Sequence, residues 1–159
     1  GRGLEISQKN VNICVKHGLS VVQGDADKDL ISYPSKSFDF VILSQTLQAT
    51  RSPEKVLNEL TRISKRAIVS FPNFGSWLVR LKLLFKGVMP QLKSLPHTWY
   101  TTPNIHLCTI KDFKKLCNKN SIKIEQSFYL NRNGKKIINP IINFFNNFFS
   151  TSGLFVLKK

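Results

Sequence analysis

Acidic residues are scarce in this chain of 159 residues, which contains nine Asp and Glu against 24 Lys and Arg and carries a net charge of +15. Residues 1–60 hold seven basic and seven acidic side chains, which leaves 17 basic and two acidic ones in residues 61–159. This imbalance favours a negatively charged partner for the C-terminal half, whether a protein, a nucleic acid or an anionic membrane. A general bias towards lysine, which supplies 18 of the 24 cations, explains the charge without any partner. Because base recognition favours the planar fork of Arg, we expect no nucleic acid.

Cysteine and histidine are also scarce. Each occurs three times, at Cys14, Cys108 and Cys117 and at His17, His97 and His106. They form no Cys-x-x-Cys, His-x-x-x-His or Glu-x-x-His pattern, so we predict no metal site, and the odd number of cysteines argues against a disulfide framework. No Ser-His-Asp arrangement is visible, and we assign no catalytic residue. The expected compartment is reducing, and because no signal peptide is visible we expect a cytoplasmic protein.

Long uninterrupted hydrophobic runs are missing as well. Residues 137–157 contain no charged side chain, but Pro140 and four asparagines interrupt them, so we predict no transmembrane segment. The chain begins at Gly1 rather than Met, and the apolar segment 3–6 follows almost at once. Such an opening is typical of the inside of a domain, and we expect an N-terminally truncated sequence.

Short apolar runs alternate with helical patterns along the chain. Strands are predicted at residues 3–6, 20–23, 38–43, 67–71, 122–130 and 153–157, and helices at 7–17, from 52, at 74–86, at 109–117 and from 139. The runs 38–43 and 67–71 are almost continuously apolar, which is expected of buried parallel strands. The alternation predicts an α/β fold, a parallel sheet with helices on both faces. Residues 87–106 contain three prolines and are predicted to form a long irregular segment.

Polar residues follow several of these strands at their carboxyl ends, where open parallel sheets bind ligands. They are Glu5, residues 25–27, residues 44–46 and Asn73. A strand-end carboxylate such as Glu5 accepts hydrogen bonds from both hydroxyls of a ribose in nucleotide-binding units; alternatively, it is only solvated. Asp25 can accept a hydrogen bond from an adenine amino group beside the backbone of Ala26, or it only stabilises a Gly-Asp turn. The glycine-rich turn that normally precedes such a carboxylate by about 20 residues is missing.

Three long runs, residues 39–50, 66–75 and 102–113, closely resemble the family of the methionine-biosynthesis protein MetW, and residues 3–6 and 23–25 are similar to it as well. The resemblance covers nearly the whole chain. It implies the class I S-adenosylmethionine-dependent methyltransferase fold, a doubly wound and mostly parallel sheet of the Rossmann-like type, without its first strand and glycine-rich loop. We therefore expect residues 1–159 to form a single, N-terminally truncated methyltransferase-like domain. Because the first strand lies in the middle of that topology, its absence is expected to expose the centre of the sheet.

The resemblance also implies a role in methionine biosynthesis, in which the protein supports homoserine O-acetyltransferase in homoserine acylation. An active methyltransferase that modifies a small molecule or a protein is the alternative, and a binder of anionic membrane or nucleic acid through the basic half is a third. The fold implies S-adenosylmethionine as cofactor, provided that the glycine-rich loop is present. The cofactor-binding residues carried over from the family hold the ribose, contact the adenine and close the pocket, and they are Glu5, Ile6, Asp25, Ala26, Ser44 and Gln45.

The proline-rich segment 87–106 is the expected contact surface for the acyltransferase. Large aromatic side chains such as Trp99 and Tyr100 anchor many interfaces. The alternative is that these rings only cover the open end of the sheet. The alternative of a membrane binder predicts contact with an anionic membrane through Trp77 and Leu81.

Overall fold

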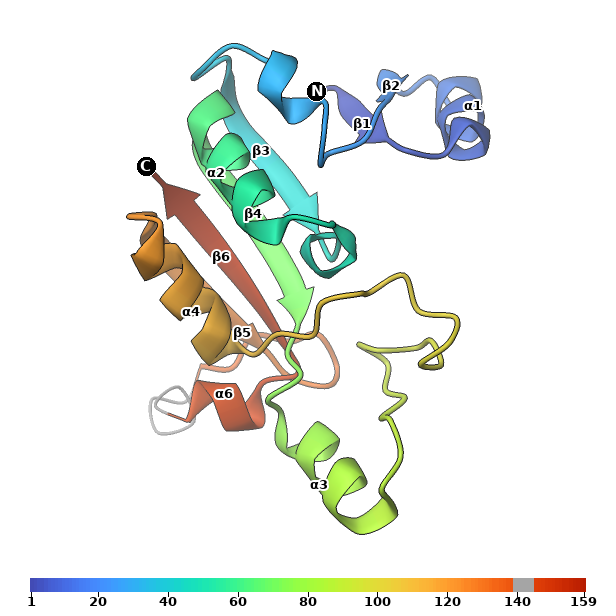
Figure 1. Ribbon diagram of the computed structural model, residues 1–159, viewed down its shortest axis with the longest axis vertical. Coiled ribbons are helices and arrows are strands. Elements are labelled where there is room, and N and C mark those ends of the chain that lie inside the picture. The colour runs from blue at the N-terminus through green and yellow to red at the C-terminus, as the bar shows by residue number, and fades with distance from the viewer. Residues whose placement is uncertain (139–144) are drawn as a thin grey trace.

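The computed structural model describes residues 1–138 and 145–159 (Figure 1). Its strands are β1 (Gly3–Glu5), β2 (Val21–Gln23), β3 (Phe38–Ser44), β4 (Ser64–Pro72), β5 (Lys123–Leu130) and β6 (Ser152–Lys158). Its α-helices are α1 (Gln8–Lys16), α2 (Pro53–Ile63), α3 (Trp77–Lys86), α4 (Ile110–Lys119) and the short α6 (Asn146–Phe149), and its 3-10 turns are η1 (Leu30–Ser32) and η2 (Leu47–Ala49). All predicted strands and the first four predicted helices are confirmed. The helix predicted from Asn139 falls partly on residues 139–144, outside the described residues.

The strands form two sheets. β1 and β2 pair in parallel, whereas the other strands form a sheet of order β3-β4-β6-β5 in which β6 runs antiparallel to both of its neighbours. Among the described residues, no strand pairs with the outer edge of β1 or with the outer edge of β3. Figure 1 shows β1 and β2 beside the four-stranded sheet rather than within it. The α/β fold is confirmed, and the described strands β1 and β2 do not pair with the four-stranded sheet.

One face of the four-stranded sheet carries the hydrophobic core. Alternate residues of β4, namely Ala67, Val69 and Phe71, are fully buried in the cluster that α2 and α4 complete, as expected when successive side chains point to opposite faces. The rings of Phe71, Phe113 and Phe155 pack with their centroids 4.7–5.6 Å apart. α2 contributes a buried apolar stripe at helical spacing, made of Val56, Leu57, Leu60 and Ile63.

The opposite face of this sheet is exposed along β3. Phe40 and Ile42 lie opposite Arg66 and Ile68 in the register of the two strands, so the four side chains share this face. Phe40 and Ile42 are 56% and 68% exposed. The prediction that β3 is buried like β4 is therefore wrong for this face. An apolar run predicts burial on both faces, but no described helix covers these two side chains and the adjoining edge of β3 is unpaired.

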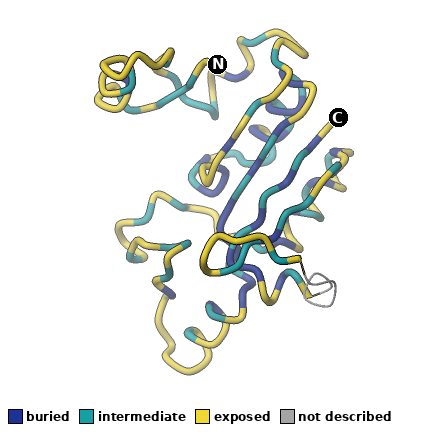
Figure 2. Tube along the Cα trace, turned by 180° about the vertical axis from the view of Figure 1, so that it is seen from behind, coloured by how far each residue is buried: buried dark blue, intermediate teal, exposed yellow. Residues whose placement is uncertain are grey.

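The N-terminal unit, residues 1–23, is small and loosely packed. Most of this unit is exposed or half-buried (Figure 2). Val11 of α1 is buried, whereas Val15 is exposed. The predicted end of α1 is confirmed, since Gly18 takes the left-handed conformation with φ of 73°. A unit that buries so little apolar surface depends on its contacts with the rest of the molecule.

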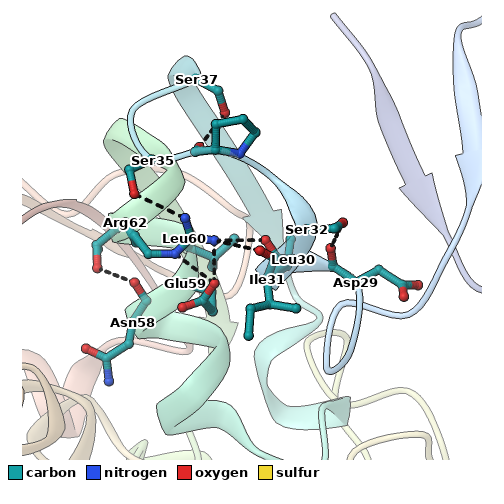
Figure 3. A network of polar contacts seen from close by, with 12 residues as sticks. Asp29, Leu30, Ile31, Ser32, Ser35, Ser37, Asn58, Glu59, Leu60 and Arg62 are labelled. Carbon is teal, nitrogen blue, oxygen red and sulfur yellow. Dashed lines mark hydrogen bonds and ion pairs between the residues drawn. The ribbon is translucent and has the colours of Figure 1, made fainter.

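Arg62 of α2 holds the connection between the N-terminal unit and β3 (Figure 3). Its guanidinium donates hydrogen bonds to the carbonyl oxygens of Leu30 and Ile31 at 3.2 and 3.4 Å. It also donates to Ser35 Oγ at 3.2 Å and to Glu59 Oε2 at 2.6 Å. The hydrogen bond with Glu59 raises the pKa of Arg62. The connection is therefore fixed to α2 along its length rather than at one point.

α3 and the segment after it extend away from the sheets (Figure 1). Val79 is the buried residue of this helix. Gly87 ends the helix with φ of 61°, and residues 87–109 contain no helix and no strand beyond an isolated bridge between Leu92 and Leu95. The predicted long irregular segment is confirmed.

Candidate functional site

Glu5 lies at the carboxyl end of β1, as predicted, and directs one carboxylate oxygen towards the start of α1. Its Oε1 accepts hydrogen bonds from the backbone N–H of Ser7 at 2.9 Å and from Asn10 Nδ2 at 3.3 Å. Ser7 occupies the N-cap position of α1, but its side chain makes no capping bond, and Glu5 holds the backbone N–H of this residue. The second oxygen, Oε2, has no hydrogen-bond partner among the described residues. One oxygen is therefore structural, and the other is available to a hydroxyl donor.

The loop after β2 brings Asp25 next to Glu5, because the backbone N–H of Gly24 donates to the carbonyl oxygen of Glu5 at 3.0 Å. Asp25 Oδ1 accepts the backbone N–H of Asp27 at 2.9 Å. The backbone N–H of Asp25 donates in turn to Asp29 Oδ2 at 2.6 Å. These bonds are expected if Asp25 stabilises a Gly-Asp turn, which was the alternative to contact with adenine. They use one of the two carboxylate oxygens of Asp25.

Ala26 and Asp27 attach this loop to the larger sheet. Ala26 packs against the hydrophobic core. The two carboxylate oxygens of Asp27 accept the backbone N–H groups of Arg51 and Ser52, both at 2.8 Å, at the start of α2, where negative charge is favourable. Sequence analysis missed this role of Asp27, because its partners are backbone groups 24 and 25 residues away and leave no signature in the sequence.

Ser44 and Gln45 end β3 beside Ser70 of β4. The Oγ atoms of Ser44 and Ser70 are 3.3 Å apart, and the backbone N–H of Gln45 donates to the carbonyl oxygen of Ser70 at 2.9 Å. Gln45 has a φ of 53°, a left-handed conformation that costs a residue other than glycine about 1–3 kcal/mol. Strained residues of this kind are common at ligand sites, but Lys36 and Ser121 share this conformation and lie outside the predicted site residues.

Gln48, in η2, connects this edge to the proline-rich segment, and sequence analysis did not single it out. The side chain is buried, and its Nε2 donates to the carbonyl oxygen of Pro72 at 3.1 Å and to Cys108 Sγ at 3.2 Å. The carbonyl oxygen of Gln48 accepts the backbone N–H groups of Ile105 and His106. Its side-chain Oε1 is buried, and within residues 1–138 and 145–159 no group donates a hydrogen bond to it.

The predicted site residues therefore form two groups rather than one. The first consists of Glu5, Ile6, Asp25 and Ala26, and the second of Ser44 and Gln45. No hydrogen bond between described residues joins the two groups directly, and the connection runs through Asp27 and the packing of Ala26. The division follows from the topology, because the groups lie on different sheets.

Asn73, the polar residue that follows the carboxyl end of β4, has a structural role. Its buried Nδ2 donates to the carbonyl oxygens of Asn147 and Ser150 at 2.9 and 2.7 Å. Its Oδ1 accepts the backbone N–H groups of Gly75 and Ile110. Since these bonds use both donors and both acceptor positions of the amide, Asn73 joins β4 to the starts of two other elements and has no capacity left for a ligand.

The two cysteines of the C-terminal half belong to the interior of the protein. Burial raises the pKa of Cys108 to about 11 and that of Cys117 to about 12, so both remain protonated at neutral pH and are poor nucleophiles. Among the described residues, no group of three or more His, Cys, Asp and Glu is placed to hold a metal ion. Within residues 1–138 and 145–159, no helix has the length and apolar character that a membrane span requires.

A hollow lined by basic side chains lies at the other end of the strands of the four-stranded sheet, by the amino ends of β3 and β4. Its volume is about 270 Å³, and the side chains that line it are Lys36, Lys65, Arg66, Lys158 and Lys159. Lys36 Nζ donates to three carbonyl oxygens, and Lys65 and Arg66 form ion pairs with Asp39 and Glu125. Much of the positive charge here is therefore satisfied within the protein.

The amino-acid sequence matches a known protein family and a curated relative. The model of the family described as "Methionine biosynthesis protein MetW" matches residues 1–157. A protein of Rhodopirellula baltica, named bifunctional methionine biosynthesis protein MetXA/MetW, is 31% identical over 128 residues, which make up 80% of this chain and 20% of that protein. The chain therefore spans about one fifth of the length of this relative.

Solved structures share the fold. A SAM-dependent methyltransferase from Thermotoga maritima matches with a TM-score of 0.65 at 20% identity, over 99% of this chain and 72% of that one. A SAM-dependent methyltransferase from Archaeoglobus fulgidus matches with a TM-score of 0.65 at 14% identity, over 99% of this chain and 75% of that one. At these identities the likeness establishes the class I methyltransferase fold and not an activity.

Proposed function

The chain belongs to the family of the methionine biosynthesis protein MetW, and on this premise we propose that it acts with homoserine O-acetyltransferase and supports the acylation of homoserine. The observation that carries the proposal is the relative that joins a MetXA part and a MetW part in one chain. Joining two modules raises their effective concentration for one another, which is favourable when they act together. We interpret the MetXA part as the acetyltransferase that the family resemblance implies.

We propose further that the carboxyl edge of the strands binds S-adenosylmethionine when the glycine-rich loop of the fold is present. The chemistry of the side chains fits this ligand. Glu5 offers an unpaired carboxylate oxygen to the ribose hydroxyls, and Asp25 and the backbone of Ala26 offer partners to the adenine. Ser44 and Gln45 would close the pocket. When bound, S-adenosylmethionine supplies a methyl group on a positively charged sulfur, and the residues of this chain orient its nucleoside part.

We also propose that residues 1–159 act as one methyltransferase-like domain in the cytoplasm. The contacts of Asp27 with the start of α2 support a single domain, because they join the N-terminal unit to the larger sheet. The three free cysteines agree with a reducing compartment.

The rate of homoserine acetylation tests the first proposal. The gene product that carries this chain is mixed with homoserine O-acetyltransferase of the same organism, and acetyl transfer is measured with and without it. We expect a higher rate in the mixture and a complex on a sizing column. If the rate is unchanged and no complex forms, the accessory role is wrong and the active methyltransferase becomes the better interpretation.

One observation favours that second function. The fold is that of class I methyltransferases, and methyl transfer requires mainly the orientation of two reactants. Its test is the release of S-adenosylhomocysteine from S-adenosylmethionine in the presence of candidate acceptors.

Calorimetry with S-adenosylmethionine tests the cofactor proposal. In the gene product, Glu5→Ala is expected to weaken binding by about 1.5–3 kcal/mol, since bonds to a charged acceptor are lost. Because Glu5 also contacts the start of α1, Asn10→Ala serves as the control: it removes one partner of Oε1 and leaves Oε2 in place. Equal affinity in the unaltered protein and in Glu5→Ala would contradict the ribose role.

A further inference from the structure

The C-terminal end of α3 presents an apolar surface that the candidate site does not use. This surface, called here the α3 tip, consists of Leu84, Phe85, Val88 and Met89, which are 75%, 77%, 55% and 43% exposed. Four large apolar side chains are thus exposed within six consecutive residues. Since burial of apolar surface contributes about 25 cal/mol per Å², large apolar side chains exposed so close together in the chain indicate a site of interaction.

The α3 tip is a formed structure rather than a frayed helix end. Gly87 ends the helix in the left-handed conformation, and its N–H donates to the carbonyl oxygen of Leu83 at 3.0 Å. Lys82 Nζ donates to the carbonyl oxygen of Gln91 at 2.6 Å, which closes the turn that carries Val88 and Met89. The tip is therefore preorganised, and the entropy cost of ordering it on binding is small. Figure 1 shows that it lies at the end of a helix directed away from both sheets.

The surroundings of the α3 tip are positively charged. The chain has no acidic residue between Glu59 and Asp112. Arg80 is engaged within the protein, because its Nε donates to a backbone carbonyl at 2.8 Å and its guanidinium lies 5.5 Å from the ring centroid of Phe148. Lys86, in the last turn of α3, is therefore the cation that accompanies the apolar side chains. The complementary surface is an apolar pocket with carboxylates on its rim.

We propose that the α3 tip docks into such a pocket on homoserine O-acetyltransferase, with Leu84 and Phe85 as the anchors. The inference rests on the proposed function, which supplies the partner. It moves the contact surface from the middle of segment 87–106 to the start of that segment and the last turn of α3. A protein is favoured over a membrane, because Lys82 and Arg80 are committed to contacts within the chain, whereas attachment to anionic lipid takes a cluster of available cations.

Binding of the chain to immobilised homoserine O-acetyltransferase of the same organism tests the proposal. The double variant Leu84→Ser/Phe85→Ser is expected to weaken binding at least about 30-fold, the loss typical of interface anchors. Both side chains lie outside the core cluster, so the variant should fold, which its thermal unfolding will verify. Ile31→Ser is the matched control, because Ile31 is 76% exposed on η1, and it is expected to leave the affinity unchanged.

A charge reversal tests the acidic rim independently. Lys86→Glu is expected to slow association about tenfold at low salt and to reduce the dependence of the association rate on salt. Lys115→Glu makes the same change of net charge on α4, at an exposed position, and is expected to change the rate less than about twofold. Equal effects of the two reversals would show that only the overall charge matters and would contradict a specific rim.

The outcomes separate this proposal from the proposed function. If the unaltered chain binds the acyltransferase and the double variant binds equally well, the docking surface is wrong and the partnership stands. If the unaltered chain does not bind, both are overturned. If the chain instead sediments with phosphatidylserine-containing vesicles, and the double variant loses only that binding, the tip contacts lipid and the proposal is overturned. The same holds if the double variant abolishes self-association alone.

Discussion

The four-stranded sheet and the N-terminal unit share the candidate site, but they differ in how they are held together. Phe71 and Phe155 of the sheet are fully buried and stack on one another. In the N-terminal unit Val11 is buried. This unit is attached to the sheet by hydrogen bonds of Asp27 and by the packing of Leu4 and Ala26. Because local stability follows buried apolar contact, the N-terminal unit should open more readily than the sheet.

The difference in packing between the two regions predicts how a bound ligand would change their local stability. The carboxylates predicted to hold the ribose and the adenine, Glu5 and Asp25, lie on the side that packs less, whereas Ser44 lies on the rigid sheet. A ligand that contacts both sides stabilises the closed arrangement by its binding free energy. The N-terminal unit should gain the most local stability from the ligand, because it opens more readily than the sheet when no ligand is bound.

The largest expected effect is on the sheet. Phe155→Ala removes a ring whose centroid lies 5.6 and 4.7 Å from those of Phe71 and Phe113, and the transfer and cavity terms together should cost about 3–5 kcal/mol of unfolding free energy. Urea denaturation followed by circular dichroism measures the loss. Phe40→Ala, on the exposed face of β3, is the control and should cost less than about 1 kcal/mol. Comparable losses would mean that this face is packed.

A pair of identical substitutions sharpens the comparison. Val69→Ala, in β4, should cost about 2–3 kcal/mol of global unfolding free energy, because the lost methyl groups leave a cavity in a closed core. Val11→Ala, in α1, should change the same quantity by less than about 1 kcal/mol, since the N-terminal unit can open without the sheet. Equal costs in urea denaturation would show that the two regions unfold as one.

Asp27→Asn loosens the attachment between the two regions. The substitution replaces a charged acceptor of two backbone N–H groups and should lower the local stability of the N-terminal unit by about 1–2 kcal/mol. Native-state hydrogen exchange should become faster in residues 3–23 and stay unchanged in β4. Asp39→Asn is the control, because Asp39 is an exposed partner of Lys65 alone. Faster exchange throughout the protein would contradict a local attachment.

The smallest effect concerns the contact between α2 and α4. Hydrogen bonds from Lys119 and Asn120 lower the pKa of Glu54 below its ordinary value of 4.5. A carboxyl whose pKa is lower in the folded state contributes stability above the unfolded pKa and loses it as the pH falls through the folded pKa. The stability difference between the unaltered chain and Glu54→Gln should therefore be small at pH 7 and should shrink as the pH falls below 4.5 and through the lowered pKa of Glu54. A difference that persists in acid would show that the carboxylate charge is not involved.

The positions of the strands and helices could be predicted from the sequence because their signals are local. Residues 67–71 form an apolar run that is interrupted by Ser70 alone. α4 begins with a reciprocal capping box between Thr109 and Asp112. The family resemblance identified the fold from the uninterrupted runs 39–50, 66–75 and 102–113.

What could not be predicted depends on contacts between distant residues. The exposure of Phe40 and Ile42 follows from a missing neighbour, which an apolar run cannot reveal. Asp27 bonds to backbone groups 24 and 25 residues away, and Gln48 reaches Cys108 across 60 residues. The division of the site residues into two groups has the same origin, since it depends on which strands pair.

Hydrogen exchange of residues 3–23 with and without S-adenosylmethionine tests most directly the claim that one site spans both regions. The measurement uses the gene product that carries this chain, with the ligand at about 100 times its dissociation constant. Such an excess supplies about 2.7 kcal/mol, so exchange in β1 and β2 should slow by up to about a hundredfold, while β4, already protected, changes little. Binding that leaves the exchange of β1 and β2 unchanged would contradict the claim.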